Sequence, residues 1–436
     1  MTSFLEKQFR LQENHTTVKT ELIAGVTTFV TMAYIIFVNP DILSKTGMPF
    51  GPLMVATCVS AAFATFLMAF LANYPIALAS GMGLNAFFAF SVVLNPAMGI
   101  NWQTALTAVF IEGVIFVLLT LTRLRETVVN AIPKTLKIGV AGGIGLFIAF
   151  IGLQGAGIVV ANPATLVGLG SIRNNLSISL ALGGLVLMAA LEHFRVKGSL
   201  LIGIVAVTGA GIALGRVSLP ESIVAVPPSL APIFMQFDFS GLGNPDFWII
   251  VFTFFFVDFF DTVGTLVGVC NRSGLLDEQG RLPRAKEALM ADAVGTVAGA
   301  MLGTSTVTSY VESASGIAQG GRTGLTAVVV GFLFLVSIFF TPLVGIVPSY
   351  ATAPALIIVG IYMMMGLRDL NFGDWTELTP AMLAFFMMPL AYSIATGIEF
   401  GIVSYVVLKI VTGRTKEVNP VMIGLTILFI FKELCA

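Results

Sequence analysis

Charged residues are scarce in this chain, and their scarcity excludes most classes of soluble protein. They make up 10% of the 436 residues, against 57% hydrophobic residues. A soluble domain contains about 25% charged residues. The 22 basic and 23 acidic side chains nearly cancel, so there is no basic excess for binding nucleic acid. We therefore expect a protein that lies in a membrane and does not bind nucleic acid.

Cysteine and histidine are scarce as well. The cysteines are Cys58, Cys270 and Cys435, too few for a disulfide scaffold, and the histidines are His15 and His193, too few for a His-rich metal site. The sequence also contains no Gly-rich phosphate loop and no Asp-rich loop motif. We expect no catalytic residue, no metal and no cofactor, which disfavours an enzyme.

Apolar runs that are long enough to cross a bilayer recur along the whole chain. A helix needs about 20 apolar residues to cross about 30 Å of hydrocarbon. We find fourteen such runs, centred near residues 30, 63, 86, 113, 147, 186, 207, 257, 295, 315, 335, 357, 386 and 405. A further run, residues 421–431, is short for a span, and we expect it to be interfacial or half-buried. The sequence predicts an all-α polytopic membrane protein in which residues 1–436 form a single transporter domain.

The positions of Lys and Arg indicate the orientation of the spans. With the N-terminus in the cytoplasm, only Lys45, Arg173 and Arg216 fall outside and Lys432 is unassigned, whereas the other 18 of the 22 fall inside. The first residues are polar and charged, unlike a cleavable signal peptide. We expect an integral membrane protein with a cytoplasmic N-terminus, and the short loops favour a bacterial inner membrane.

The two halves of the chain resemble each other. Residues 104–109 (TALTAV) match residues 323–328 (TGLTAV), and residues 77–80 (ALAS) correspond to residues 306–309 (TVTS). With seven spans in each half, the second copy must be inverted, and inverted repeats are typical of secondary transporters. The alternative is that helices rich in small residues look alike without any duplication. The predicted repeats cover about residues 20–216 and about residues 246–413.

Two segments are poor continuous helices: residues 74–88 in span 3 and residues 303–316 in span 10. Each begins with β-favouring or Pro-interrupted sequence and continues with small residues, so we predict a short extended stretch that leads into a half-helix. Extended backbone at membrane depth is tolerated only where it lines a cavity or is buried in protein. Half-helix N-termini direct N–H groups toward a site at the midplane. The alternative, small residues for close helix packing, does not explain the polar run 304–309 or Glu312.

Acidic residues lie within apolar runs, whereas no Lys or Arg lies deep in any span. An ionised acid near the bilayer centre costs at least about 2.5–3.5 kcal/mol, so such residues are functional candidates. Asp258 and Asp261 are three positions apart and share a helix face. Without a neighbouring cation they do not both ionise readily, which suits proton binding or acceptance of hydrogen bonds from a neutral N–H-bearing ligand. The acids are Glu112, Asp258, Asp261, Asp292, Glu312 and Glu399.

The remaining polar candidates each have a structural alternative. Glu312 begins the second half-helix, where it is either a ligand or a helix cap. Asn85 is one turn into the first half-helix, as a site residue or a contact between helices. Asp292 is equally a structural or a functional residue, and Glu112 is expected to be an internal hydrogen-bond partner. We expect Glu399, near the outer end of span 14, to face water.

Four stretches resemble a known family. They are residues 21–34 (ELIAGVTTFVTMAY), 81–90 (GMGLNAFFAF), 256–266 (FVDFFDTVGTL) and 303–313 (GTSTVTSYVES). They are similar to the nucleobase:cation symporters, in the AzgA-like branch of hypoxanthine/guanine/adenine permeases, and the resemblance covers nearly the whole chain. It implies a core of spans 1–4 and 8–11 and a gate of spans 5–7 and 12–14. Substrate is then expected between core and gate, at the half-helix ends of spans 3 and 10.

The resemblance also implies roles for individual residues. The family acids of spans 8 and 10 are Asp261 and Glu312 here, and both are expected to accept purine N–H groups. Related uracil permeases often carry His where this chain has Thr262 and Thr265, so Asp258 is the expected substitute in proton coupling and shares a proton with Asp261. The expected substrate-binding residues are Asp261, Glu312, Asn85, Ser80, Gly81, Ser309 and Tyr310, and the expected proton-coupling residues are Asp258, Asp261 and Glu312.

The function implied by the resemblance is secondary active import of purine nucleobases by proton symport with alternating access. The form of residues 257–261 is more similar to hypoxanthine/guanine permeases than to adenine permeases, so adenine is the alternative substrate. The expected partners are a purine nucleobase, a proton, membrane lipid and, because members of the family often dimerise, a second copy of the chain. The main rival is an anion transporter of the same fold, of the sulfate or bicarbonate type. A polytopic enzyme and a passive channel are the other rivals.

Overall fold

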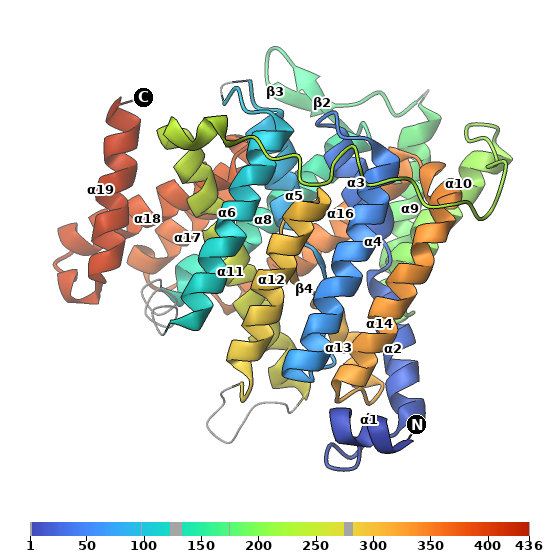
Figure 1. Ribbon diagram of the computed structural model, residues 1–436. Helices are drawn as coiled ribbons and strands as arrows, with labels where there is room; N and C mark the ends of the chain where they lie inside the picture. Colours follow the sequence, from blue (N-terminus) through green and yellow to red (C-terminus); the bar gives the residue numbers. More distant parts are fainter. Residues whose placement is uncertain (1, 97, 123–132, 174, 274–281, 436) are drawn as a thin grey trace.

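The computed structural model describes residues 2–96, 98–122, 133–173, 175–273 and 282–435, most of which are helical (Figure 1). The elements of the first half are α1 (Thr2–Phe9), α2 (Val18–Met32), α3 (Ile35–Ser44), α4 (Phe50–Leu67), η1 (Met68–Ala72), β1 (Leu78–Ser80), α5 (Met82–Ala86), η2 (Phe87–Val93), α6 (Trp102–Leu121), α8 (Lys134–Gly155), β2 (Val159–Asn162), β3 (Leu166–Leu169), α9 (Leu176–His193) and α10 (Ser199–Ala213). The elements of the second half are η3 (Phe239–Gly243), α11 (Pro245–Ser273), α12 (Ala285–Leu302), β4 (Val307–Ser309), α13 (Ser313–Ala318), α14 (Gly324–Ser337), η4 (Ile338–Phe340), α15 (Thr341–Gly345), α16 (Ser349–Met364), η5 (Met365–Asp369), α17 (Trp375–Leu390), α18 (Ile394–Val411), η6 (Thr415–Glu417) and α19 (Pro420–Cys435).

The fourteen predicted spans are confirmed by this order of elements. In the described residues, eight helical stretches are long and apolar enough to cross a membrane, and shorter apolar helices accompany them. Helices α2 and α3 together make the first span, and the two broken segments fall at spans 3 and 10, as predicted. The N-terminus and the β2–β3 hairpin lie at opposite ends of the molecule (Figure 1).

Side-chain caps explain where several helices begin. The Asn101 side chain accepts a hydrogen bond from the Thr104 N–H at 2.7 Å and starts α6, and Thr323 accepts from the Leu325 N–H and starts α14. These polar side chains replace backbone partners that the first turn of a helix lacks. The two matching sequence stretches therefore begin spans 4 and 11, which are equivalent in two repeats of seven spans.

The two extended stretches pair with each other. Strands β1 and β4 are antiparallel and fully buried, with Leu78 opposite Ser309 and Ser80 opposite Val307. Antiparallel pairing means that spans 3 and 10 run in opposite directions, as inverted repeats require. Pairing also satisfies backbone groups that an isolated extended segment would leave unbonded inside the membrane. The predicted extended stretches are thus confirmed.

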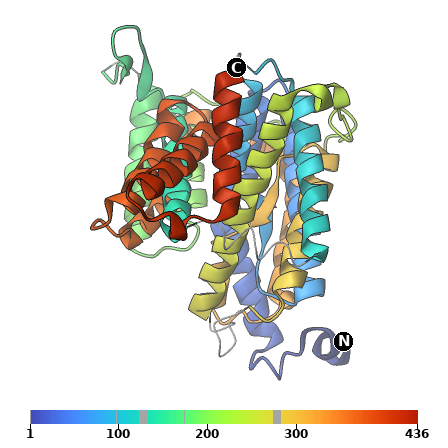
Figure 2. The same cartoon turned by 90° about the vertical axis from the view of Figure 1, so that its left-hand side faces the viewer.

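The helices pack in two groups. One group contains α2–α6 and α11–α14, with close packing of α12 on α6 and of α14 on α4 and α2. The other contains α8–α10 and α16–α18, with close packing of α8 on α16 and α17. Glycines allow the close approach, since a β-carbon on Gly139 would lie 2.4 Å from the Ala381 carbonyl oxygen. Figure 2 shows the two groups side by side, with α19 in front and between them.

Helix α19 is half-buried, which confirms the expectation for residues 421–431. Met422, Thr426 and Phe429 are buried along one side, whereas residues such as Ile427 are exposed. The Phe429 ring lies 6.2 Å from the Phe252 ring of α11, and α19 also contacts α18. The helix therefore rests against both groups.

One expectation about a charged residue is wrong. Glu399 was expected to face water, but it is only 6% exposed, because α8, α11, α17 and α19 surround α18. A second charged residue of α18, Lys409, is fully buried in the last turn and forms 2.7 Å ion pairs with Glu377 and Glu417. Burial of an unpaired ammonium group would be costly, so these two carboxylates make its position tolerable.

Candidate functional site

The short ribbon formed by β1 and β4 brings the starts of the two half-helices together. The Gly81 N–H donates to the Thr306 carbonyl, and the Tyr310 N–H donates to the Ala77 carbonyl, both at 2.9 Å. Gly81 precedes α5, and a β-carbon at this position would lie 3.0 Å from Thr308 Cγ2. The ribbon therefore fixes Gly81 and Tyr310 at opposite ends of one compact structure.

Glu312 lies at the N-cap position of α13, but its side chain caps no N–H group of that helix. The carboxylate instead accepts a 2.7 Å hydrogen bond from the Tyr34 hydroxyl. Tyr34 is buried and lies between α2 and α3, in the interrupted first span. The structure thus gives no support to the alternative in which Glu312 is a helix cap.

A network of hydroxyl and amide groups surrounds the start of α5. The Ser80 hydroxyl donates to Asn85 Oδ1 at 2.9 Å and lies 3.3 Å from the Thr304 hydroxyl. Asn39 Nδ2 donates to the hydroxyls of Thr304 and Thr57 at 3.0 and 2.7 Å. Among the residues that the structure describes, Asn85 Nδ2 has no hydrogen-bond partner, although the whole side chain is buried. This amide N–H₂ is therefore a donor available to a ligand acceptor.

Asp261 lies on α11 beside the same ribbon. Its carboxylate is within hydrogen-bonding reach of the Thr308 hydroxyl of β4. Electrostatic interactions join Asp261, Tyr310 and Glu312, and the Tyr310 hydroxyl donates to the Ser80 carbonyl at 2.6 Å. The structure therefore gathers Asp261, Glu312, Ser80 and Tyr310 beside the ribbon.

Asp258 has different neighbours. It is fully buried, and the carboxylates that act on it most strongly are those of Asp292 on α12 and Glu112 on α6, ahead of Asp261. Asp292 accepts hydrogen bonds from the Thr262 hydroxyl at 2.9 Å and from the Ser309 hydroxyl at 3.4 Å. Ser309, an expected substrate-binding residue, thus faces Asp292.

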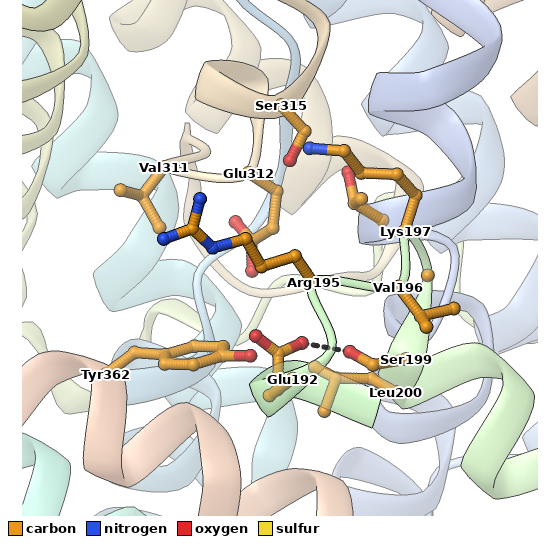
Figure 3. Close-up of a pocket in the computed structure, with 12 residues that line it drawn as sticks. Glu192, Arg195, Val196, Lys197, Ser199, Leu200, Val311, Glu312, Ser315 and Tyr362 are labelled. Atoms are coloured by element: carbon orange, nitrogen blue, oxygen red, sulfur yellow. Dashed lines mark hydrogen bonds between the residues drawn. The ribbon is translucent and has the colours of Figure 1, made fainter. Parts of the chain in front are cut away.

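A cavity of about 320 Å³ lies where the two groups of helices meet (Figure 3). Glu312 is the expected substrate-binding residue that lines it, together with Thr31, Val311 and Ser315 of the first group. The second group contributes Glu192, residues 195–200 and Tyr362. The Glu192 carboxylate accepts a hydrogen bond from the Ser199 hydroxyl, and Tyr362 points toward Glu192 (Figure 3). Arg195 and Lys197 are exposed at the rim.

Several of these residues were missed by the sequence analysis. Tyr34, Glu192 and Tyr362 come from separate segments of the chain and share no motif that would group them. Glu192 ends an apolar helix, where an acid next to the basic residues of a loop looks like ordinary solvated sequence. The one available signal was Tyr34, a polar hydroxyl inside the first apolar run, and it lies within a stretch that resembles the family.

Comparison with known proteins decides the family. The Xan_ur_permease model, described as "Permease family", matches residues 19–400. The chain belongs to this family. It is 48% identical to the guanine/hypoxanthine permease PbuG of Bacillus subtilis over 97% of this chain and 98% of that protein. It is 46% identical to the adenine permease AdeP of Escherichia coli over 98% of this chain and 95% of that protein.

A solved structure supports the fold independently. The transmembrane domain of the cyanobacterial bicarbonate transporter BicA superposes with a TM-score of 0.66, at 17% identity, over 88% of this chain and 97% of that one. At this identity the likeness concerns the fold alone, an arrangement of inverted repeats. The family, the apolar helices and this fold identify an integral membrane protein that is a transporter.

Proposed function

We propose that this permease imports purine nucleobases, with hypoxanthine or guanine preferred and adenine as the alternative. The observation that carries the proposal is the meeting of two partly buried carboxylates, Asp261 and Glu312, beside the buried amide of Asn85, whose Nδ2 has no hydrogen-bond partner among the described residues. A carboxylate only accepts hydrogen bonds, whereas an amide N–H₂ donates them. A purine presents N–H groups together with carbonyl or ring-nitrogen acceptors, so this set of groups matches both. The names of PbuG and AdeP support the same substrate class.

The proposed binding mode assigns a task to each group. Asp261 and Glu312 accept purine N–H groups, while Asn85 Nδ2 and the backbone N–H groups at the half-helix starts donate to purine acceptors. Ser80, Gly81, Ser309 and Tyr310 shape the site by holding the two strands together. Tyr34 orients the Glu312 carboxylate through its hydrogen bond. Such a site favours the binding of a planar ligand whose hydrogen-bond donors and acceptors alternate along one edge.

Transport follows from movement between the two groups of helices. We propose that spans 1–4 and 8–11 form the core that carries the substrate and that spans 5–7 and 12–14 form the gate. The cavity between the groups supports this division, because Glu312 of one group faces Glu192 and Tyr362 of the other. Alternating access then exposes the site to one side of the membrane at a time.

The co-substrate is proposed to be a proton, and the membrane is proposed to be a bacterial inner membrane with the N-terminus in the cytoplasm. With that orientation, the loop that carries Arg195 and Lys197 lies on the cytoplasmic side, so the described cavity belongs to an inward-facing state. We also propose a homodimer in the lipid bilayer. The charge distribution of the loops supports the proposed orientation, and the resemblance to the family supports the other parts of the proposal.

Uptake of radiolabelled hypoxanthine by cells that lack their own purine permeases tests the substrate proposal. Asp261→Asn and Glu312→Gln each remove an ionised acceptor whose hydrogen bond is worth about 1.5–3 kcal/mol, so we expect at least about tenfold slower uptake at low substrate concentration. Glu399→Gln, a buried acid in the second group of helices, is the matched control. Competition by guanine supports the preferred substrates, and competition by adenine alone reassigns the substrate.

The same assay separates the proposal from anion transport. The fold shared with a bicarbonate transporter and the basic rim of the cavity are the observations that favour an anion. Inhibition of uptake by bicarbonate or sulfate, together with full purine uptake in Asp261→Asn and Glu312→Gln at normal expression, would contradict the proposed site.

A further inference from the structure

Three buried acids form a second cluster in the first group of helices. They are Glu112 of α6, Asp258 of α11 and Asp292 of α12, and each is 0% exposed. Electrostatic interactions link every pair among them. Within the described residues, no ion pair reaches Glu112 or Asp258. We name this group the core acid cluster.

The three helices converge closely at this point. A β-carbon on Gly113, the residue after Glu112, would lie 3.0 Å from Cγ2 of both Thr296 and Val297 on α12. Thr296 is one helical turn beyond Asp292, so α6 and α12 touch beside the cluster. Phe116, Phe259 and Ala293 belong to one hydrophobic cluster. Each of them lies on the same helix as one of the acids and within four residues of it. The core acid cluster is therefore enclosed by packed side chains.

Two members of the cluster, Glu112 and Asp258, lack donors. Among the described residues no donor group bonds any of their four carboxyl oxygens, although the two side chains lie within hydrogen-bonding reach of each other. Ionised carboxylates only accept, so two that face each other cannot satisfy one another, whereas one added proton converts an oxygen into a donor for its neighbour. Buried polar atoms without partners are costly. One proton shared between Glu112 and Asp258 would supply the donor that they lack.

Few other charged groups lie on the elements that pack against the helices of the cluster; α18, which contacts α11, carries Glu399 and Lys409. Elements α4, η1, β1 and β4, which pack against α12, carry no Asp, Glu, Lys, Arg or His, and the titratable group of α4 is the Cys58 thiol. Helix α11 adds Asp261, one turn from Asp258 and beside the proposed substrate site. Hydrogen bonds connect the two sites, because Asp292 accepts from Thr262, next to Asp261, and from Ser309 of the ribbon.

We propose that the core acid cluster binds the transported proton, at a site separate from the purine. One carboxylate takes up the proton to give a carboxylic acid that donates to a facing carboxylate, and it releases the same proton on the other side of the membrane. Uptake lowers the negative charge next to Asp261 and Ser309, which favours the binding of purine at the ribbon. This inference rests on the proposed purine transport, and it assigns Glu112 and Asp292 to the coupling machinery together with Asp258.

Purified full-length protein in proteoliposomes tests the inference through two readouts. The first is exchange of radiolabelled hypoxanthine without any ion gradient, and the second is its accumulation under an inward proton gradient, with proton entry followed by an internal pH dye. For one proton per purine, a tenfold proton gradient supports about tenfold accumulation by wild type. We expect Asp258→Asn and Glu112→Gln to keep exchange but to lose accumulation and purine-dependent proton entry. The control Glu399→Gln should keep both.

Three outcomes would overturn the inference. The first is unchanged accumulation and proton entry in both variants, and the second is accumulation by wild type under a sodium gradient but not under a proton gradient. If both variants lose exchange, Asp258→Glu is tested in their place, because it retains an acid at this position. This variant should keep exchange and shift the pH profile of accumulation. An unchanged pH profile is the third outcome that would overturn the inference. If the wild type exchanges no purine, the proposed function itself is wrong. The exchange readout separates this case from failure of the inference about the proton site.

Discussion

The Tyr34 hydroxyl orients one carboxylate of the proposed substrate site. It donates to Glu312 at 2.7 Å from a fully enclosed position between α2 and α3. A hydrogen bond to a charged group contributes more than one between neutral groups. The hydroxyl also limits the rotamers of Glu312, which would otherwise be free to turn within the cavity.

We predict that Tyr34→Phe raises the Km for purine uptake about tenfold, with a smaller change in the maximal rate. The reason is that loss of one hydrogen bond to a charged group, about 1.5–3 kcal/mol, leaves Glu312 ionised but poorly oriented. Uptake kinetics at normal expression provide the measurement. Tyr350→Phe is the control, because the Tyr350 hydroxyl is buried and has no hydrogen-bond partner in the described part of the chain. An unchanged Km for Tyr34→Phe would mean that Glu312 does not contact the substrate.

At the level of single residues, the buried acids could be identified from the sequence, but the residues that contact them could not. Asp258 and Asp292 were visible because an acid in an apolar run is unusual. The contact of Glu112 with them was not visible, because it depends on how α6, α11 and α12 pack. Tyr34 and Glu192 were missed for the same reason: each looks ordinary within its own segment.

The start of α14 shows how one element can depend on another far away in the chain. Both carboxyl oxygens of Glu21, on α2, accept hydrogen bonds there: from the N–H groups of Arg322, Thr323 and Thr326 at 2.9, 3.3 and 3.1 Å, and from the Thr326 hydroxyl at 2.6 Å. Asn73 accepts from the Gly324 N–H at 2.7 Å. These groups satisfy backbone donors that a buried helix start would leave unbonded, so span 1 caps span 11.

Removal of this cap should lower stability. We expect Glu21→Ala to lower the midpoint of thermal unfolding of the purified protein, because loss of a helix cap costs about 0.5–2 kcal/mol and here several backbone donors lose their partner together. The measurement is thermal unfolding of wild type and variant in the same detergent. Glu13→Ala, which removes a solvent-exposed 3.7 Å ion pair with Arg10, is the control and should leave the midpoint unchanged. Equal midpoints for all three proteins would contradict the capping role.

At the level of elements, the pattern of apolar residues and the composition predicted most of the helices and strands. The polar, β-favouring run before Glu312 predicted β4, and the corresponding segment of the first repeat predicted β1. Both segments are too irregular in sequence for a continuous helix. The pairing of β1 with β4 needed the inverted repeat as well. Glu21 was overlooked because an acid in the first turn of a helix normally faces solvent, where it interacts favourably with the positive end of the helix dipole. Only the packing of α2 on α14 buries it.

At the scale of the whole molecule, two groups of helices meet along the cavity that holds Glu312. A polar network joins α8, α17 and α18 within the second group. Lys409 bridges Glu377 and Glu417, and Glu377 also accepts from the Thr135 hydroxyl. Beside them Arg414 pairs with Asp374 at 2.7 Å and holds the pKa of that carboxyl below its ordinary value. These contacts stay within one group, so the group can move as a unit against the other.

Cross-linking tests this movement. Lys197 and Ser315 approach each other across the cavity from the two groups (Figure 3). We expect a reducible bifunctional thiol reagent to block purine uptake when it joins Cys side chains placed by Lys197→Cys and Ser315→Cys, because the groups are then locked together. The measurement is uptake in proteoliposomes before cross-linking, after it and after reduction, which should restore transport. Joining Asp374→Cys to Arg414→Cys, both within the second group, should leave uptake at the level of the same variant before cross-linking. Full transport by the protein cross-linked across the cavity would show that the groups need not move apart, and alternating access between them would be wrong.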